Sequence, residues 1–78
     1  MNQTRKIFAR IEKIISRQDK NNKKYLILEV DNDSAIFVFP TRINRESWNL
    51  FKEGQEYQFT VEEGKGSINL LVSFNLCE

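Results

Sequence analysis

Residues 25–39 read YLILEVDNDSAIFVF, two apolar runs on either side of the polar turn Asp31–Ser34. Short runs rich in Tyr, Ile, Val and Phe favour β-strands, and a four-residue polar connection between two such runs is typical of a hairpin. We therefore expect strands at Tyr25–Asp31 and Ala35–Phe39, and Pro40 ends the second because it lacks an amide donor. The stretch predicts an antiparallel hairpin.

The alternation within this hairpin gives it two different faces. One face is aliphatic and consists of Leu26, Leu28, Val30, Ile36 and Val38. The other face carries aromatic rings and one isoleucine: Tyr25, Ile27, Phe37 and Phe39. With the aliphatic face inward, the aromatic face is a surface. In the alternative phase, Phe37 and Phe39 belong to the core and Ile36 and Val38 are exposed; mixed burial of both faces, where the sheet of a small barrel curls, is also open. The orientation of the strand Ala35–Phe39 therefore decides whether its rings form a surface or belong to the core.

The segment before the hairpin predicts one further strand. Ile7–Arg17 begins with apolar residues at every second position and then changes phase, so we expect a bend or bulge near Glu12–Ile14. Gln18–Lys23 is polar throughout and is typical of a turn. A first strand therefore leads directly into the hairpin.

The segment after the hairpin has a helical period. Asn44 is a residue type that caps helices, and Trp48 and Phe51 lie three positions apart, on one face. Gly54 favours the left-handed conformation that stops a helix. We expect an α-helix of about two turns beginning at Arg45, whose aromatic face packs against the end of a barrel.

The last part of the chain predicts two strands, Gln55–Glu63 and Ser67–Cys77, joined by a turn at Gly64-Lys65-Gly66. In the first of them Tyr57, Phe59 and Val61 share a face. In the second, we expect one face to be apolar: Ile68, Leu70, Val72, Phe74 and Leu76. Its opposite face is expected at the surface and consists of Asn69, Leu71, Ser73, Asn75 and Cys77.

Three strands, a helix and two strands are the element order of the oligonucleotide/oligosaccharide-binding (OB) fold, which the chain resembles over nearly its whole length. The resemblance implies an all-β fold, a five-stranded OB-type Greek-key barrel with a short α-helix between strands 3 and 4. Residues 1–78 are expected to form a single domain, with residues 1–5 flexible. Ala9 or Lys13 stands where this fold usually has a glycine in its first strand. An SH3-like barrel is the competing architecture, which the two-turn helix disfavours.

The composition excludes several kinds of chemistry. The chain has no histidine and one cysteine, Cys77, so imidazole bases and thiolate zinc clusters are excluded. Asp31 and Asp33 lack the further ligands of a calcium loop, and Gly64–Ser67 lacks the spacing of a phosphate-binding loop. We expect no enzymatic activity, no cofactor and no metal.

The charge distribution favours an anionic partner. Residues 1–24 hold eight Lys/Arg against two Asp/Glu, whereas residues 25–78 hold four against nine. In OB folds the outer face of strands 2 and 3 carries the ligand. The resemblance therefore implies binding of single-stranded DNA or RNA by the aromatic face of Tyr25, Ile27, Phe37 and Phe39. The cations expected to contact phosphates are Arg10, Lys20, Lys23, Lys24 and Lys65.

A second hypothesis stays open: the domain is a protein-interaction or subunit barrel whose apolar face is covered by a protein partner or by a second copy. The opposite charges would then meet across neighbouring strands or lie in solvent. Arg42 and Arg45 either bind phosphate or solvate the loop before the helix, and we favour the latter. Short apolar runs and a single cysteine favour a cytoplasmic location, with no membrane segment.

Overall fold

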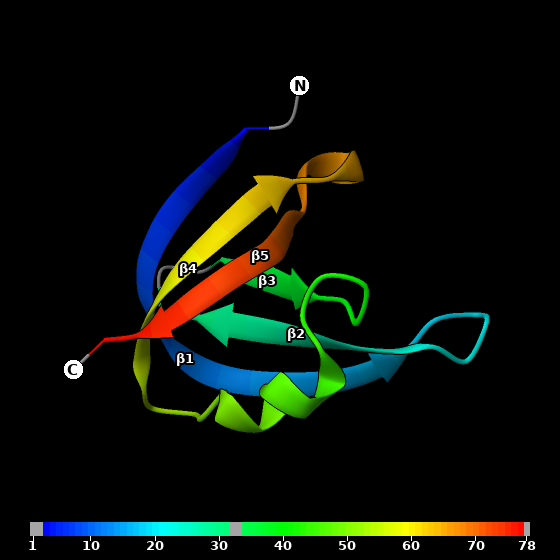
Figure 1. Cartoon of the computed structure of the whole chain (residues 1–78), viewed down its shortest axis with the longest axis horizontal. Coiled ribbons are helices and arrows are strands. Elements are labelled where there is room, and N and C mark those ends of the chain that lie inside the picture. Colours follow the sequence, from blue (N-terminus) through cyan, green and yellow to red (C-terminus); the bar gives the residue numbers. More distant parts are fainter. Residues whose placement is uncertain (1–2, 32–33, 78) are drawn as a thin grey trace.

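The computed structural model describes residues 3–31 and 34–77. It has five strands and two short helices (Figure 1): β1 (Thr4–Gln18), β2 (Lys24–Val30), β3 (Ala35–Val38), η1 (Arg45–Leu50), β4 (Glu56–Glu63), η2 (Lys65–Ser67) and β5 (Asn69–Leu76). The predicted order of three strands, a helix and two strands is confirmed. Within the described residues, neither helix has the length and apolar character needed to cross a membrane.

The strands close into a barrel in the order β1-β2-β3-β5-β4. The long β1 closes it, because its first half pairs with β4 and its second half with β2, both antiparallel, as its curved ribbon in Figure 1 shows. β3 and β5 run parallel. This is the five-stranded OB-type barrel. Of residues 1–5, expected to be flexible, Thr4 and Arg5 pair with Glu62 and Val61 at the start of β1, and residues 1–2 lie outside the described residues.

The bend of β1 lies where the sequence predicts it. The pairing of β1 with β2 passes from Ile11 to Lys13 and skips Glu12, which is a β-bulge. The amide of Ile14 then donates to the Glu53 carboxylate at 3.0 Å instead of to a neighbouring strand. Because the bulge shifts the alternation by one residue, both halves of β1 turn apolar side chains toward the core.

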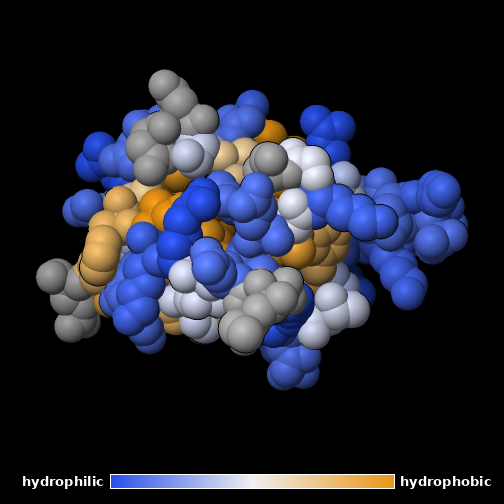
Figure 2. Space-filling model, turned by 90° about the horizontal axis from the view of Figure 1, so that it is seen from above, coloured by the Kyte–Doolittle hydropathy of each residue, from blue (hydrophilic) through white to orange (hydrophobic). Residues whose placement is uncertain are grey.

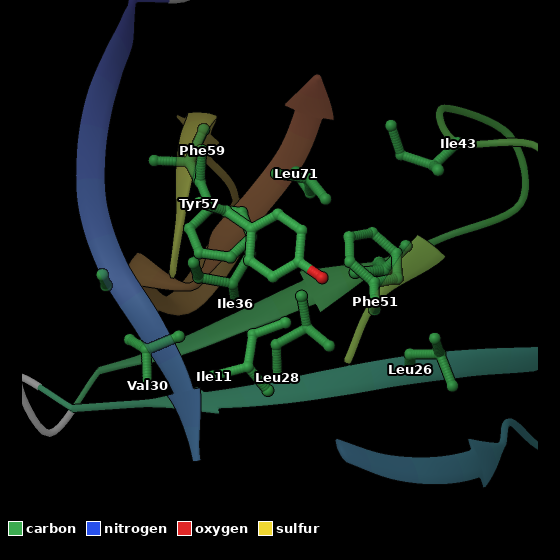
Figure 3. Close-up of a cluster of buried hydrophobic side chains, with 13 residues drawn as sticks. Ile11, Leu26, Leu28, Val30, Ile36, Ile43, Phe51, Tyr57, Phe59 and Leu71 are labelled. Carbon is green, nitrogen blue, oxygen red and sulfur yellow. The ribbon is translucent and has the colours of Figure 1, made fainter. Parts of the chain in front are cut away.

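The core fills the barrel interior with side chains from all five strands and from the segment after β3 (Figure 3). Its buried residues are Ala9, Ile11, Leu26, Leu28, Val30, Ile36, Val38, Ile43, Phe51, Tyr57, Phe59, Val61 and Leu71. Ile36 and Val38 are 0% exposed. The aliphatic face of the hairpin is therefore the buried one, and the alternative phase of β3 is excluded.

The helix between β3 and β4 differs in type from the prediction. The predicted short helix is present and begins at Arg45 as expected, but η1 is a six-residue 3₁₀-helix rather than an α-helix, and the predicted Asn44 cap is wrong because the Asn44 side chain makes no capping hydrogen bond. Phe51 is already extended (φ −81°, ψ 125°), and Gly54 has its positive φ of 88° in the turn before β4. The prediction that Trp48 packs on the barrel is confirmed, and its Nε1 donates to the Ile43 carbonyl at 3.1 Å.

The hydroxyl of Tyr57 explains why η1 ends early. It donates to the carbonyl of Leu50 at 2.6 Å and accepts from the amide of Lys52 at 2.9 Å. These are backbone groups that a longer helix would have to satisfy internally. Figure 3 shows this hydroxyl pointing toward Phe51 from the centre of the core. A tertiary contact therefore sets the end of the helix.

The expected faces of β5 are wrong in part. Leu71, expected at the surface, is 1% exposed, and Leu76, expected inward, is 52% exposed. The pairing of β5 with β4 passes from Ser73 to Leu71 and skips Val72. This second bulge reverses the alternation, so that Phe74 on one side of it and Leu71 on the other both face the core.

Candidate functional site

Three aromatic rings lie together on the outer face of β2 and β3. The ring centroids of Tyr25 and Phe39 are 5.3 Å apart, those of Tyr25 and Phe37 6.3 Å, and those of Phe37 and Phe39 6.4 Å. The interplanar angles are between 18° and 30°, so the three rings are nearly parallel. Each ring is half-buried, as is Ile27, which pairs with Phe37. We call these four residues the platform.

The platform continues beyond the hairpin. Ile27 pairs with Ile15 on β1, and Phe37 pairs with Leu70 on β5. Residues paired in this way point to the same face of a sheet. An apolar row of half-buried side chains, Ile15, Ile27, Phe37 and Leu70, therefore crosses four strands, and we call it the cross-strand row.

Sequence reasoning missed Ile15 and Leu70 as members of this surface. A signal for Ile15 exists, because the phase change predicted near Glu12–Ile14 places it on the face opposite Ile14. Leu70 was expected toward the core; the bulge at Val72 places Leu71 there instead.

A basic loop adjoins the Tyr25 end of the platform. The Asp19 carboxylate accepts from the amides of Asn21 and Lys23 at 2.8 and 2.9 Å and holds the turn, while Asn22 takes a positive φ of 63°. The predicted cations Lys20, Lys23 and Lys24 are exposed on this loop and at the start of β2. Figure 2 shows the loop as a hydrophilic lobe projecting to the right.

Arg17 is a cation of this region that the sequence did not single out. It is exposed and pairs with Tyr25 across β1 and β2. Its position follows from the same phase change that places Ile15, two residues earlier, on the outer face. The platform thus has cations both on the loop and on the neighbouring strand.

Two of the predicted cations do not join this group. Arg10 is held at the far end of β2 by Asp31, whose carboxylate lies 3.9 Å from the guanidinium and accepts from the Arg10 amide at 3.3 Å. About six residues of strand, roughly 20 Å, separate Tyr25 from Asp31. Lys65 is exposed in η2, and no contact among the described residues joins it to the platform.

Arg42, before η1, and Arg45, its first residue, also have structural partners. Arg42 donates to both oxygens of Glu62 at 2.7 and 3.3 Å, and this carboxylate is largely buried. The guanidinium of Arg45 lies 5.8 Å from the Trp48 ring centroid. The expectation that Arg42 simply lies in solvent is therefore wrong, because β4 brings the Glu62 carboxylate within hydrogen-bond distance of its guanidinium.

The chemistry available on this face is that of binding. Within residues 3–31 and 34–77, no group of three or more metal-ligating side chains comes together, and every buried side-chain polar atom has a hydrogen-bond partner. The platform offers aromatic rings and aliphatic surface, and the loop offers cations. Together they suit a ligand with flat apolar rings and negative charges.

Comparison with known proteins gives one informative similarity. A 44-residue segment, 56% of the chain, is 39% identical to cold shock protein CspB of Bacillus caldolyticus and covers 67% of that protein. No protein-family model matches the chain.

Proposed function

The chain belongs to the cold shock protein family, an OB-fold family that binds nucleic acid, and we propose that it is a non-catalytic binder of single-stranded nucleic acid. Bases stack on the platform of Tyr25, Ile27, Phe37 and Phe39. The lysines of the β1–β2 loop contact the phosphates. The observation that carries this proposal is the set of three nearly parallel, half-buried rings beside exposed cations.

The energetics of the face support single strands over duplexes. Stacking of a base on an aromatic side chain contributes about 1–3 kcal/mol and is available only where the base is unpaired. The net charge of the chain is only +1, whereas strong duplex binders carry a clear excess of positive charge. Binding therefore depends on the rings, and the cations add a salt-dependent part.

A titration tests this proposal. A fluorescently labelled single-stranded oligonucleotide and a duplex of the same sequence are titrated with the protein at low and at moderate salt. We expect the single strand to bind more tightly and its affinity to fall as salt rises, because counterions are released on binding. Absence of binding at low salt, or tighter binding of the duplex, contradicts the proposal.

An NMR shift map of the same titration tests the face. We expect the largest amide shifts in the platform and in the β1–β2 loop. Phe8 is the internal control, since its side chain is 69% exposed on the outer face of β1 and lies opposite β4. Shifts centred on Phe8 would place the oligonucleotide on another face, and a salt-insensitive dimer in light scattering that buries Phe37 would favour the protein-interaction hypothesis instead.

A further inference from the structure

The first half of β1 is an edge of the sheet. Residues 4–10 pair with β4 on one side, whereas β2 pairs with β1 only from Ile11 onward. No other strand within residues 3–31 and 34–77 pairs with this half of β1. Figure 1 shows it as the outermost ribbon of the barrel, with β4 on its inner side. The side of this segment that faces away from β4 is therefore open to a further strand.

The hydrogen bonds of β1 show which backbone groups face the open side. Ile11 donates its amide at 3.0 Å to the carbonyl of the residue before β4. Because bonded positions alternate in an antiparallel pair, Lys6 and Phe8 direct their amides and carbonyls away from β4. Arg10 has the same phase, and its carbonyl accepts from the Asp31 amide at 3.1 Å on that side. The donors and acceptors of Lys6 and Phe8 therefore form the free edge of a strand.

The side chains of this edge are apolar and basic. Phe8 is 69% exposed, more than any other large apolar side chain of the described residues. Lys6 is exposed two residues before it, and its neighbour on β4 is the uncharged Thr60. Arg5 is exposed and donates to the Asn69 side chain at 2.7 Å, which leaves its charge without a carboxylate. No ion pair among the described residues involves Lys6 or Arg5.

The carboxylates near this edge lie at its two ends. Asp31 is paired with Arg10, and Glu56 lies opposite Arg10 on β4. At the other end, the Glu62 carboxylate is bound within the protein, and Glu63 is exposed beyond the pairing with β1. The middle of the edge therefore has an excess of positive charge, which attracts an anionic partner.

This charge distinguishes two kinds of incoming strand. Residues 4–10 hold three cations and no carboxylate. If two copies pair here with Phe8 facing Phe8, Lys6 lies opposite the second copy's Arg10, and like charges in such positions are destabilising. A lysine on an edge strand also acts against self-pairing in natural proteins. A strand that carries carboxylates on both sides of an apolar residue instead places opposite charges at these positions.

We propose that the open edge of β1 binds an extended acidic segment of a protein partner, which adds a strand beside residues 4–10. The backbone of the partner pairs with Lys6 and Phe8. An apolar side chain of the partner covers Phe8, and a carboxylate faces Lys6. In strand addition of this kind, main-chain hydrogen bonds supply affinity and the side chains select the partner. The platform lies on β2 and β3, so this edge stays free when the platform holds nucleic acid.

The test uses the ¹⁵N-labelled full chain and a synthetic peptide with blocked ends, Val-Glu-Val-Phe-Val-Glu-Val. This sequence reads the same in both directions, so a glutamate meets Lys6 in either strand orientation when the two aromatic rings face each other. We expect amide exchange of Lys6 and Phe8 to slow about tenfold at roughly 90% saturation, because both amides gain acceptors. The amides of Ile7 and Ala9 face β4 and should keep their rates.

Two control peptides separate backbone pairing from charge. Lysine in place of both glutamates should weaken binding about tenfold at low salt, because like charges then meet at Lys6. N-methylation of the phenylalanine and glutamate amides keeps the side chains but removes the donors that face β1, and should abolish binding. Phe8→Ala should weaken binding of the acidic peptide about two- to fivefold, the effect of one cross-strand pair. Phe37→Ala, on the platform, is the matched control and should leave this affinity unchanged.

The remaining outcomes overturn the inference. Unchanged exchange of Lys6 and Phe8 with the peptide, or equal binding of the lysine peptide, contradicts an acidic partner strand. A dimer in light scattering with both amides protected before peptide is added assigns the edge to a second copy. Protection of these amides by an oligonucleotide assigns it to nucleic acid. Peptide binding is measured without oligonucleotide, so failure of the proposed function leaves the inference intact, and circular dichroism shows that Phe8→Ala is folded.

Discussion

The molecule contains two aromatic clusters that lie on opposite sides of the barrel wall. The inner cluster consists of Phe51, Tyr57, Phe59 and Phe74, with interplanar angles between 32° and 70°. The outer cluster consists of Tyr25, Phe37 and Phe39, with angles between 18° and 30°. The inner rings are tilted against one another and the outer rings are nearly parallel.

This difference separates rings that build the fold from rings that are available to a ligand. Tilted and edge-on contacts let the inner rings fill the barrel at the density of a protein interior. The outer rings contact one another but keep exposed surface, and a common orientation suits the flat face of a base. Inner rings are therefore expected to govern stability, and outer rings to govern binding.

Replacing an inner ring should have the largest effect. Phe59 is 0% exposed and contacts Tyr57 at 5.4 Å between centroids. Phe59→Ala is expected to lower the free energy of unfolding by about 3–5 kcal/mol, because it removes buried surface and leaves a cavity. Urea denaturation followed by circular dichroism measures the loss. A variant as stable as the wild type would show that the core is not organised around this ring.

Replacing an outer ring should change binding and leave stability nearly intact. Phe37→Ala is expected to weaken single-strand binding by about 1–3 kcal/mol, the contribution of one stacked base. Fluorescence anisotropy measures the affinity, and a urea melt of the same sample provides the comparison with Phe59→Ala. Unchanged affinity together with a large loss of stability would assign Phe37 to the core rather than to a binding face.

Removing the Tyr57 hydroxyl from the inner cluster tests its role in ending η1. Tyr57→Phe keeps the ring but deprives the Leu50 carbonyl and the Lys52 amide of their shared partner. We expect the free energy of unfolding to fall by about 1–2 kcal/mol, since these groups are partly buried. Hydrogen exchange should accelerate at Lys52, and oligonucleotide affinity should stay at the wild-type value. A loss of oligonucleotide affinity would show that the inner cluster influences binding at the outer cluster.

The smallest expected effect distinguishes two cations of the outer surface. Lys23→Gln should reduce the slope of log affinity against log salt by about 0.7, the share of one phosphate contact with a single strand. Arg10→Gln should leave the slope unchanged, because Arg10 is paired with Asp31 at the far end of β2. Titrations at several salt concentrations measure both slopes. A larger change for Arg10 than for Lys23 would place the phosphates on the other side of the platform.

Much of the fold was predictable because its signals are local. The alternation of Tyr25–Phe39, the phase change near Glu12 and the polar turns depend on neighbouring residues, and the structure has the strands and the bulge there. The platform was predictable for the same reason. The bulge at Val72 was not, because the three consecutive apolar residues Leu70, Leu71 and Val72 fit either phase of the strand, and the pairing with β4 decides between them.

The position of the cations beside the platform was predictable only in part. Lys20, Lys23 and Lys24 are close to Tyr25 in the sequence, so their neighbourhood follows from the hairpin itself. Arg10 was expected to join these lysines beside the platform. Its charge alone does not indicate which carboxylate its guanidinium pairs with in the folded chain. Its partner, Asp31, comes next to it through strand pairing over 21 positions of the chain.

The sequence by itself determined the order of the elements, the two faces of the central hairpin and the absence of histidine chemistry. These depend on residue type and on the two-residue period of a strand. Only the tertiary structure decided that η1 is a 3₁₀-helix ending at Leu50, that Leu71 faces inward, and that Leu70 extends the platform. The two leucines of β5 depend on pairing between strands far apart in the chain, and the end of η1 depends on hydrogen bonds to the Tyr57 hydroxyl; local periodicity encodes neither.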